Sequence, residues 1–333
     1  MNASARTVFA LTLGLAAAGT HVRVQSLARI GNWPISHIGI AVRDVDVTAR
    51  AFAEVFDVPV PRVNPNNRLA APDGSEAAVA KAATVYLPNF LIEMQQSATP
   101  FGPIYDTVQK YGQTVHHISF DVRDRYGDLR DLLVQKGGTW RGGTRETTWA
   151  YVDFRERLGA TFEPISQQIF DMLDKGTTKA APGGTLGTQP VTTIGIVVRN
   201  ADDAAKAWAE ILGVTIPPAR VVKAMDYPKG STADRKAHTK VTSWTHENNI
   251  TIELVEPVGG PSPWSEALQK QGGNAVHHLT FNVGNRMDEM IRLLQAKGGT
   301  LVYGRPGGSI AGLDFTDKLG IVIELTGTAQ KGA

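Results

Sequence analysis

The sequence predicts an α+β protein built from two tandem copies of one domain, each copy containing two βαβββ modules. The main observation is an internal repeat: Val115–Val122 carries a His-His pair in a strand-like pattern, and Val276–Val283 repeats it. Each copy also opens with the same strand and helix pattern, near Ile38 and near Ile194. A repeat of about 160 residues is too long for a solenoid unit and has the length of a whole domain.

Composition bounds the class of protein. The chain has 333 residues, of which 42% are hydrophobic and 20% charged, and this suits two globular domains with a core in each. The net charge of +2, without a basic cluster, gives no reason to expect a nucleic-acid partner. The sequence contains no cysteine, which excludes disulfides and cysteine-bearing zinc sites. Either a monomer or a homodimer is compatible with these features.

The first 30 residues lie outside the repeat and have features of a signal peptide. Arg6 precedes an apolar run at 8–18 that has the length of a signal-peptide core and is too short to span a bilayer. Ser26–Ala28 supplies a small-x-small cleavage site. These features favour a periplasmic or secreted protein without a membrane span. The polar stretch 21–25 instead favours a mis-assigned start or a frayed helix, and a cytoplasmic protein.

The elements of the first copy follow from periodicity and from capping residues. Asp44 stands where an N-cap is needed before the first helix. The second helix is expected to begin after Pro103 and to end at Gly112. Strands are expected at 36–43, 82–87, 90–95, 115–122, 149–154 and 160–165, helices at 46–56, 104–111 and 126–136, and polar loops at 64–76 and 221–237.

The repeat also sets the expected domain boundaries. Residues 34–166 are predicted to form the first domain and 190–327 the second. The stretch 167–189 between them is predicted to be a linker, because 175–190 is rich in Gly, Thr, Ala and Pro, and 165–174 is predicted to be a bridging helix. The sequence leaves open whether the modules of one copy pair with each other or with modules of the other copy.

Four histidine and glutamate residues fall at matching strand positions of the first copy. His37 opens the first strand of one module and Glu93 lies in its last strand, while His117 and Glu163 hold the same places in the next module. Strand alternation predicts that His116 points to the opposite side from His117. If both modules curl alike, their pseudo-twofold symmetry brings the four side chains to one place.

Two imidazoles and two carboxylates suit a divalent metal ion such as Zn, Co, Ni, Mn or Fe, and the sequence does not choose among them. Four protein ligands leave two octahedral positions for water or substrate oxygens. In the second copy, Glu253, His278 and Glu324 match, but Thr193 stands in place of His37. A threonine hydroxyl is a poor ligand, so the second site is expected to be weaker or degenerate.

These patterns resemble the vicinal oxygen chelate superfamily, the family of glyoxalases, bleomycin resistance proteins and extradiol dioxygenases. The second copy is most similar to methylmalonyl-CoA epimerase, and the first copy fits the same frame more loosely. The matching motifs are Ile252–Pro257, Ser262–Pro263, His277–Val283, Ala296–Gly299 and Val322–Leu325.

The resemblance implies two tandem domains with curved mixed sheets that each enclose a cleft, and a metal held by His37, Glu93, His117 and Glu163. It further implies a substrate that chelates the metal through vicinal oxygens, and an isomerase, epimerase or lyase that removes a proton next to a carbonyl. Glu93 or Glu163 would act as the base. The additional acid of the epimerases has no match at 77–83.

Two alternatives remain open. One is an Fe(II)-dependent extradiol-type dioxygenase in which His37, His117 and Glu163 form a two-histidine, one-carboxylate triad. The other is a non-catalytic protein of the same fold that binds a small molecule. Metal content separates the binding protein from the enzymes, and oxygen consumption separates the two enzymes.

Overall fold

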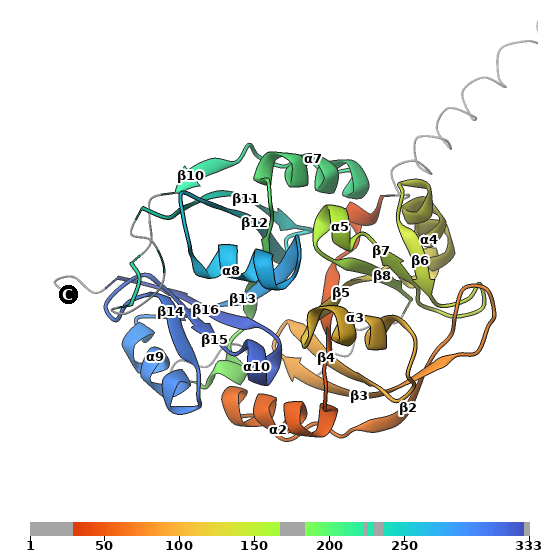
Figure 1. Ribbon diagram of the computed structural model, residues 1–333, viewed down its shortest axis with the longest axis horizontal. Coiled ribbons are helices and arrows are strands. Elements are labelled where there is room, and N and C mark those ends of the chain that lie inside the picture. Colours follow the sequence, from red (N-terminus) through yellow and green to blue (C-terminus); the bar gives the residue numbers. More distant parts are fainter. Residues whose placement is uncertain (1–28, 167–183, 223–225, 229–232, 234–235, 330–333) are drawn as a thin grey trace, which may run out of the picture.

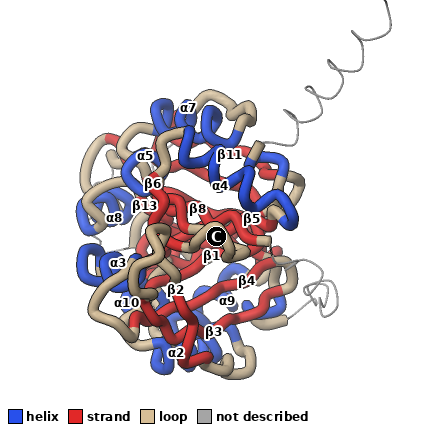
Figure 2. Tube along the Cα trace, turned by 90° about the vertical axis from the view of Figure 1, so that its right-hand side faces the viewer, coloured by secondary structure: helices blue, strands red, loops and turns tan. Residues whose placement is uncertain are grey.

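The computed structural model describes residues 29–166, 184–222, 226–228, 233 and 236–329. Nearly all of the predicted signal peptide, and most of the predicted bridging helix and linker, lie outside these residues. The described chain is α+β, as predicted, with two mixed eight-stranded sheets that each curl into a half-barrel (Figure 1). Strands fill the middle of the molecule and helices lie around them (Figure 2). Among the described helices, none has the length and apolar character needed to cross a membrane.

The first sheet has the strand order β2-β3-β4-β1-β5-β8-β7-β6. A short 3-10 helix, η1 (Ile30–Asn32), precedes it, and α3 (Pro103–Tyr111) joins its two modules. The first module consists of β1 (Ile35–Ala41), α2 (Val45–Phe56), β2 (Asn64–Leu69), β3 (Ala78–Leu87) and β4 (Phe90–Ser97). The second consists of β5 (Thr114–Asp121), η2 (Arg123–Arg125), α4 (Tyr126–Gln135), β6 (Thr139–Gly142), β7 (Tyr151–Asp153), α5 (Arg155–Leu158) and β8 (Thr161–Ile165).

The second sheet repeats this order as β10-β11-β12-β9-β13-β16-β15-β14. Its first half contains η3 (Leu186–Thr188), β9 (Val191–Val197), α7 (Ala201–Leu212), β10 (Arg220–Val222), β11 (His238–His246) and β12 (Ile250–Val258), followed by α8 (Pro263–Lys270). Its second half contains β13 (Ala275–Gly284), α9 (Met287–Ala296), β14 (Thr300–Gly304), β15 (Ile310–Asp314), α10 (Thr316–Leu319) and β16 (Val322–Gly327).

The pairing of β1 with β5 answers the question of which modules pair. These strands are antiparallel neighbours, and β9 and β13 are paired in the same way, so the two modules of a copy share one sheet. Each first strand also pairs in parallel with the last strand of its own module, β1 with β4 and β5 with β8. The four strands at the centre of each half-barrel therefore come from both modules.

Most elements form where periodicity and capping place them. The Asp44 side chain accepts a hydrogen bond from the Val47 amide and starts α2, whose apolar face is buried. The prediction of a loop at 64–76 was wrong in part, because Asn64–Leu69 pairs with β3 as an edge strand. Its residues are mostly exposed and polar, so it carries no alternating apolar pattern. The prediction of a loop at 221–237 was likewise wrong in part, because Arg220–Val222 (β10) pairs with β11 as an edge strand.

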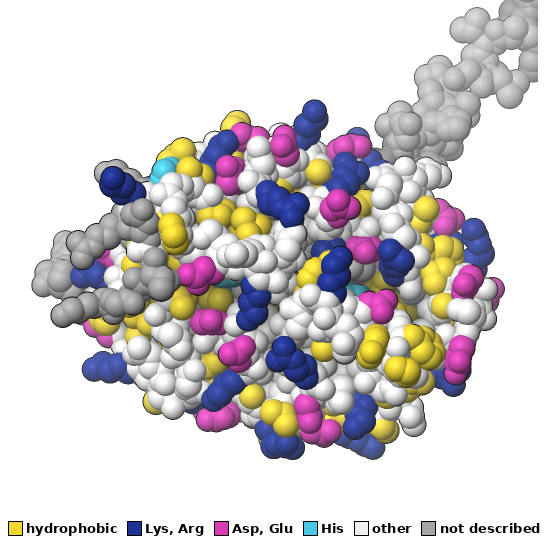
Figure 3. All heavy atoms as spheres, viewed as in Figure 1, with side chains coloured by type: hydrophobic (Ala, Val, Ile, Leu, Met, Phe, Trp, Pro, Cys, Tyr) yellow, Lys and Arg dark blue, Asp and Glu magenta, His cyan; other side chains and the backbone are white. Residues whose placement is uncertain are grey.

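The two copies pack against each other through one continuous core. Phe56 of α2 meets Phe281 of β13 with ring centroids 5.7 Å apart, and Trp208 of α7 meets Phe162 of β8 at 5.1 Å. Figure 1 shows α2 beside α10 and α5 beside α7, in agreement with the contacts between them. On the face shown in Figure 3, acidic and basic side chains are interspersed, as the small net charge suggests.

Candidate metal centre

The four residues singled out in the first copy lie on four adjacent strands, in the order β4, β1, β5 and β8. Gly39 of β1 is level with Glu93 on β4 and with His117 on β5. Glu163 on β8 is level with Ser119, two residues after His117 on β5. The register therefore brings His37, Glu93, His117 and Glu163 together on the inner face of the half-barrel. We refer to these four residues as the first cluster.

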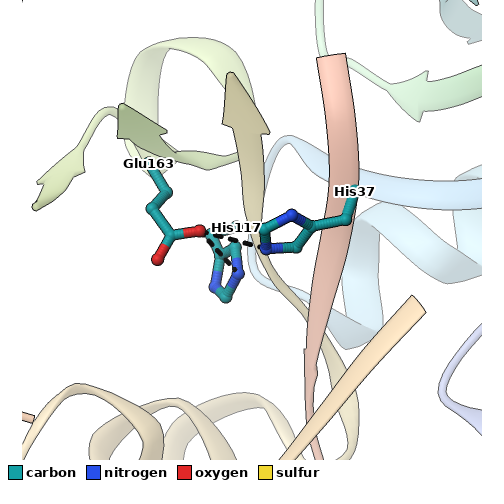
Figure 4. A group of neighbouring side chains, drawn as sticks. All are labelled: His37, His117 and Glu163. Carbon is teal, nitrogen blue, oxygen red and sulfur yellow. Dashed lines mark ion pairs between the residues drawn. The ribbon is translucent and has the colours of Figure 1, made fainter. Parts of the chain in front are cut away.

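One oxygen of the Glu163 carboxylate faces both imidazoles (Figure 4). Its Oε2 is 3.1 Å from His37 Nε2 and 3.4 Å from His117 Nε2. One potential ligand atom from each of these residues lies within 4.8 Å of the others. Glu93 sits at the edge, with its Oε2 3.6 Å from His117 Nε2, and its side chain is 21% exposed whereas that of Glu163 is 6% exposed.

In both imidazoles, Nδ1 contacts a side chain on the side of the ring away from the cluster. His37 Nδ1 lies 3.0 Å from Ser36 Oγ, and this hydroxyl donates to the Ser119 carbonyl at 3.4 Å. His117 Nδ1 lies 3.0 Å from His116 Nδ1. In both rings, therefore, Nδ1 has a partner outside the cluster while Nε2 faces the cluster.

The expected position of His116 needs a correction. Its ring lines a separate cavity together with Lys110 and Arg155, as strand alternation predicts, but it also contacts His117 directly. The cause is a bulge, because the register between β1 and β5 shifts between Gly39 and Ile40 and leaves His116 as the extra residue. A bulge bends the strand and re-aims a side chain. Simple alternation could not predict this contact.

A cavity of about 210 Å³ opens at the cluster. Its lining includes His37, Glu93 and Glu163 together with Tyr86, Leu91 and Trp149. Two further lining residues, which the sequence did not single out, form a hydrogen-bonded chain to Glu93. Tyr151 Oη donates to Gln95 Oε1 at 3.2 Å, and Gln95 Nε2 donates to Glu93 Oε2 at 3.0 Å.

The pKa values of the two carboxylates in the first cluster are shifted in opposite directions. Burial raises the pKa of Glu93 to about 7, an effect that His37 and Gln95 only partly offset. Burial would also raise the pKa of Glu163, but the adjacent His117 and His37 lower it below its usual range. Burial lowers the pKa of His117 to about 3, so its ring is neutral. Burial also acts to lower the pKa of His37, but Glu163 and Glu93 together outweigh it and raise this pKa.

Two unsatisfied atoms indicate that the cluster fits a cation. His117 Nε2 and Glu163 Oε2 are buried, and within the described part of the chain neither makes a well-directed hydrogen bond. Buried polar atoms without a partner are uncommon in folded proteins and call for an explanation. A divalent ion would satisfy both atoms, since neutral imidazole nitrogens and carboxylate oxygens are suitable ligands for it.

The second copy has a smaller cluster made of Glu253, His278 and Glu324. His278 Nε2 lies 3.6 Å from Glu253 and 3.7 Å from Glu324. Both oxygens of Glu324 accept hydrogen bonds, from Thr280 Oγ1 and from Tyr303 Oη, each at 2.9 Å. These donors compete with a metal for the carboxylate, and Thr193 supplies no imidazole. We call these three residues the second cluster.

The tyrosines near the two clusters come from different strands. In the first copy Tyr151 of β7 faces Gly142 of β6, whereas in the second Tyr303 of β14 faces Gly312 of β15. A Cβ atom on either glycine would lie within 3 Å of the opposing ring, at 2.9 Å and 2.2 Å. The ring thus fills a similar place from opposite strands, and aligning the copies could not reveal Tyr151.

Comparison with known proteins supports the family resemblance. Residues 193–316 match the family model described as the Glyoxalase/Bleomycin resistance protein/Dioxygenase superfamily. No match was found among curated proteins.

Several solved structures are similar to this chain. A variant of 4-hydroxymandelate synthase from Streptomyces coelicolor has a TM-score of 0.58 at 14% sequence identity, covering 91% of this chain and 94% of that one, which shows a shared two-domain fold. A fusion of a xylose isomerase-like TIM barrel with a 4-hydroxyphenylpyruvate dioxygenase has a TM-score of 0.48 at 12% identity, covering 90% of this chain and 50% of that one. Methylmalonyl-CoA epimerase from Mycobacterium tuberculosis has a TM-score of 0.32 at 23% identity, covering 43% and 90%.

Proposed function

We propose that this chain is a metal-dependent enzyme of the glyoxalase/bleomycin resistance protein/dioxygenase superfamily. The premise is that residues 193–316 match the family model and that the first domain repeats the fold of the second. The first cluster binds one divalent ion, which is Zn, Co, Ni, Mn or Fe. The reaction is proton transfer next to a carbonyl, as in an isomerase, epimerase or lyase. The substrate is a small molecule with vicinal oxygens.

One observation carries this proposal. Two imidazoles and two carboxylates converge at a cavity, and two of their buried atoms lack a well-directed hydrogen bond within the described residues. A divalent ion bound there would polarise a carbonyl and stabilise the negative charge that develops on its oxygen when the adjacent proton leaves.

Glu93 is the better candidate for the base. Its carboxylate lines the cavity in which the substrate would bind. It is also the more exposed of the two carboxylates, and Gln95 orients it by a single hydrogen bond. Glu163 is buried between His37 and His117, which suits a permanent ligand.

The remaining lining residues shape the substrate site. Tyr86, Leu91 and Trp149 give it an apolar wall that would pack against a hydrophobic body and exclude water. Burial and the nearby carboxylates raise the pKa of Tyr151 well above its usual value. Its phenol therefore stays protonated and serves as a hydrogen-bond donor.

The test combines metal analysis with hydrogen exchange. Metal-loaded protein incubated in D₂O with candidate 2-substituted thioesters or 2-oxo adducts is expected to exchange the α-proton. Glu93→Gln should abolish exchange and still fold, while the matched change Glu253→Gln in the second cluster should leave the exchange rate unchanged. Absence of bound metal after loading would overturn the proposal.

A second candidate is an Fe(II)-dependent dioxygenase. The observation that favours it is the compact group His37, His117 and Glu163, which leaves Glu93 at the edge and has the composition of a facial triad. Oxygen consumption and ring cleavage with catechols, without α-proton exchange, would select this reaction. Metal binding with neither reaction would leave a small-molecule binding protein.

A further inference from the structure

The geometry points to His116 as a positioning residue. We propose that His116 Nδ1 accepts a hydrogen bond from the Nδ1–H of His117, and that this bond fixes His117 as the tautomer whose Nε2 lone pair faces the first cluster. The role in metal binding rests on the proposed function, whereas the hydrogen bond itself is a property of the metal-free protein.

The packing of the His116 and His117 rings restricts which of their nitrogens can carry a proton. His116 is 4% exposed and His117 is fully buried, their planes are 87° apart, and their Nδ1 atoms are 3.0 Å apart. At this separation one nitrogen must donate and the other must accept, because a neutral imidazole has one N–H and one lone pair. Tyr151 packs against both rings with centroids 4.9 Å away, which restricts their rotation.

The direction of the bond follows from the other nitrogen of His117. His117 Nε2 lies 3.4 Å from Glu163 and 3.6 Å from Glu93, at the centre of the first cluster. A ligating nitrogen needs a free lone pair, so the proton must reside on Nδ1 and His116 must accept it. The competing arrangement places the proton on Nε2, facing Glu163, and would block metal binding. Within the described residues His117 Nε2 makes no well-directed hydrogen bond to either carboxylate, which favours the arrangement with the proton on Nδ1 and His116 as its acceptor.

The same pair occurs in the second copy. His277 Nδ1 lies 3.1 Å from His278 Nδ1, with the rings 85° apart, and the register shift falls at the equivalent position of β13. His278 retains two carboxylate neighbours there, although the counterpart of His37 is Thr193. In both copies, therefore, the histidine that faces the carboxylates has a second histidine bonded to its Nδ1. The pair in the second copy provides a matched control for substitutions of His116.

Two variants of similar shape isolate the acceptor. In His116→Asn the side-chain Oδ1 can take the place of Nδ1, whereas His116→Leu offers no acceptor. Histidine ¹⁵N NMR of the metal-free protein should show the Nδ1–H tautomer of His117 in the parent and in His116→Asn. In His116→Leu, signal should shift toward the Nε2–H tautomer. A purely structural role for His116 would not make this distinction.

Zinc affinity gives the second readout, measured by chelator competition in a Glu324→Gln background so that the first cluster dominates the signal. We expect His116→Leu to weaken zinc binding by about 10- to 100-fold, the usual effect of losing a partner of a ligating histidine. His116→Asn should restore most of the affinity, and His277→Leu should leave it unchanged.

Two results would overturn the inference: a His117 that carries its proton on Nε2 in the metal-free parent, or equal zinc affinities in His116→Leu and His116→Asn. If the parent binds none of the divalent ions Zn, Co, Ni, Mn and Fe, the proposed function fails. The tautomer measurement still tests the hydrogen bond in that case, and His116→Asn suffices for the comparison if His116→Leu does not fold.

Discussion

The imidazole of His117 lies directly over Gly39. A Cβ atom at residue 39 would lie 1.9 Å from His117 Cε1 and 2.2 Å from its Nε2. Gly195 and His278 repeat this relationship at 1.9 and 2.0 Å. Because no larger residue fits beneath the ring, glycine on the central strand allows the imidazole to lie across the sheet between the two carboxylates.

Gly39→Ala should therefore displace His117 and weaken metal binding at the first cluster by at least about tenfold, comparable to the loss of an orienting partner. The overpacking should also lower the free energy of unfolding by about 1–3 kcal/mol. Isothermal titration and thermal unfolding measure the two effects. Gly195→Ala is the control, since it should destabilise the second domain and leave metal binding at the first cluster intact. Unchanged affinity in Gly39→Ala would contradict this prediction, because it would show that the His117 ring can still bind the metal when residue 39 carries a Cβ atom.

Metal stoichiometry follows from the difference between the two clusters. We expect about one tightly bound metal ion per chain, because the second cluster lacks the fourth ligand and both Glu324 oxygens already accept hydrogen bonds. His37→Thr reproduces the second-copy residue in the first cluster and should abolish tight binding. Elemental analysis after dialysis measures both. Two equivalents that survive His37→Thr would contradict the prediction.

Much of the cluster could be predicted from the sequence, because the repeat places His37, Glu93, His117 and Glu163 at equivalent strand positions. The antiparallel pairing of β1 with β5 then brings the modules together within a copy. Residues that act through irregular features could not be predicted in this way. The contact of His116 with His117 depends on a bulge, which no periodicity reveals.

Other residues of the site could not be predicted from the sequence for related physical reasons. Tyr151 has a glycine, Gly312, as its counterpart in the second copy, so comparison of the repeats hides its role. The edge strand β2 contributes Asn67 and Leu69 to the cavity but is polar and exposed, and its only signal is backbone pairing with β3. Gly39 and Gly195 were visible in the repeat, yet their purpose becomes clear only from the ring above each of them.

Metal binding should release a proton near neutral pH. Burial raises the pKa of Glu93 to about 7, so in the metal-free protein this carboxyl is largely protonated below that pH. A metal requires the carboxylate, and its apparent affinity should therefore rise with pH from about 6 to 8. Calorimetry in buffers of different ionisation enthalpy measures the released protons. Glu93→Gln should reduce the release to the share that comes from His37, whose pKa is also raised. A pH-independent affinity in the parent would argue against Glu93 as a ligand.

The hydrogen bond from Gln95 should tune the proposed base. This bond lowers the pKa of Glu93, opposing the larger effect of burial. Gln95→Leu removes the donor, so the pKa of Glu93 should rise and the carboxylate form should become rarer at neutral pH. Metal binding and base catalysis both require this carboxylate. At a metal concentration below saturation, the acidic limb of the exchange-rate profile should therefore move to higher pH.

At pH 7 the exchange rate of Gln95→Leu should fall several-fold and should recover toward the parent value as the pH is raised. Tyr151→Phe removes only the donor to Gln95 at 3.2 Å and should shift the profile in the same direction by less. The position in the second copy that corresponds to Gln95 is already apolar, Val255, so Val255→Leu serves as the control and should leave the profile in place. A uniform loss of rate at every pH in Gln95→Leu would assign Gln95 a packing role instead, because lost packing does not recover as the base ionises.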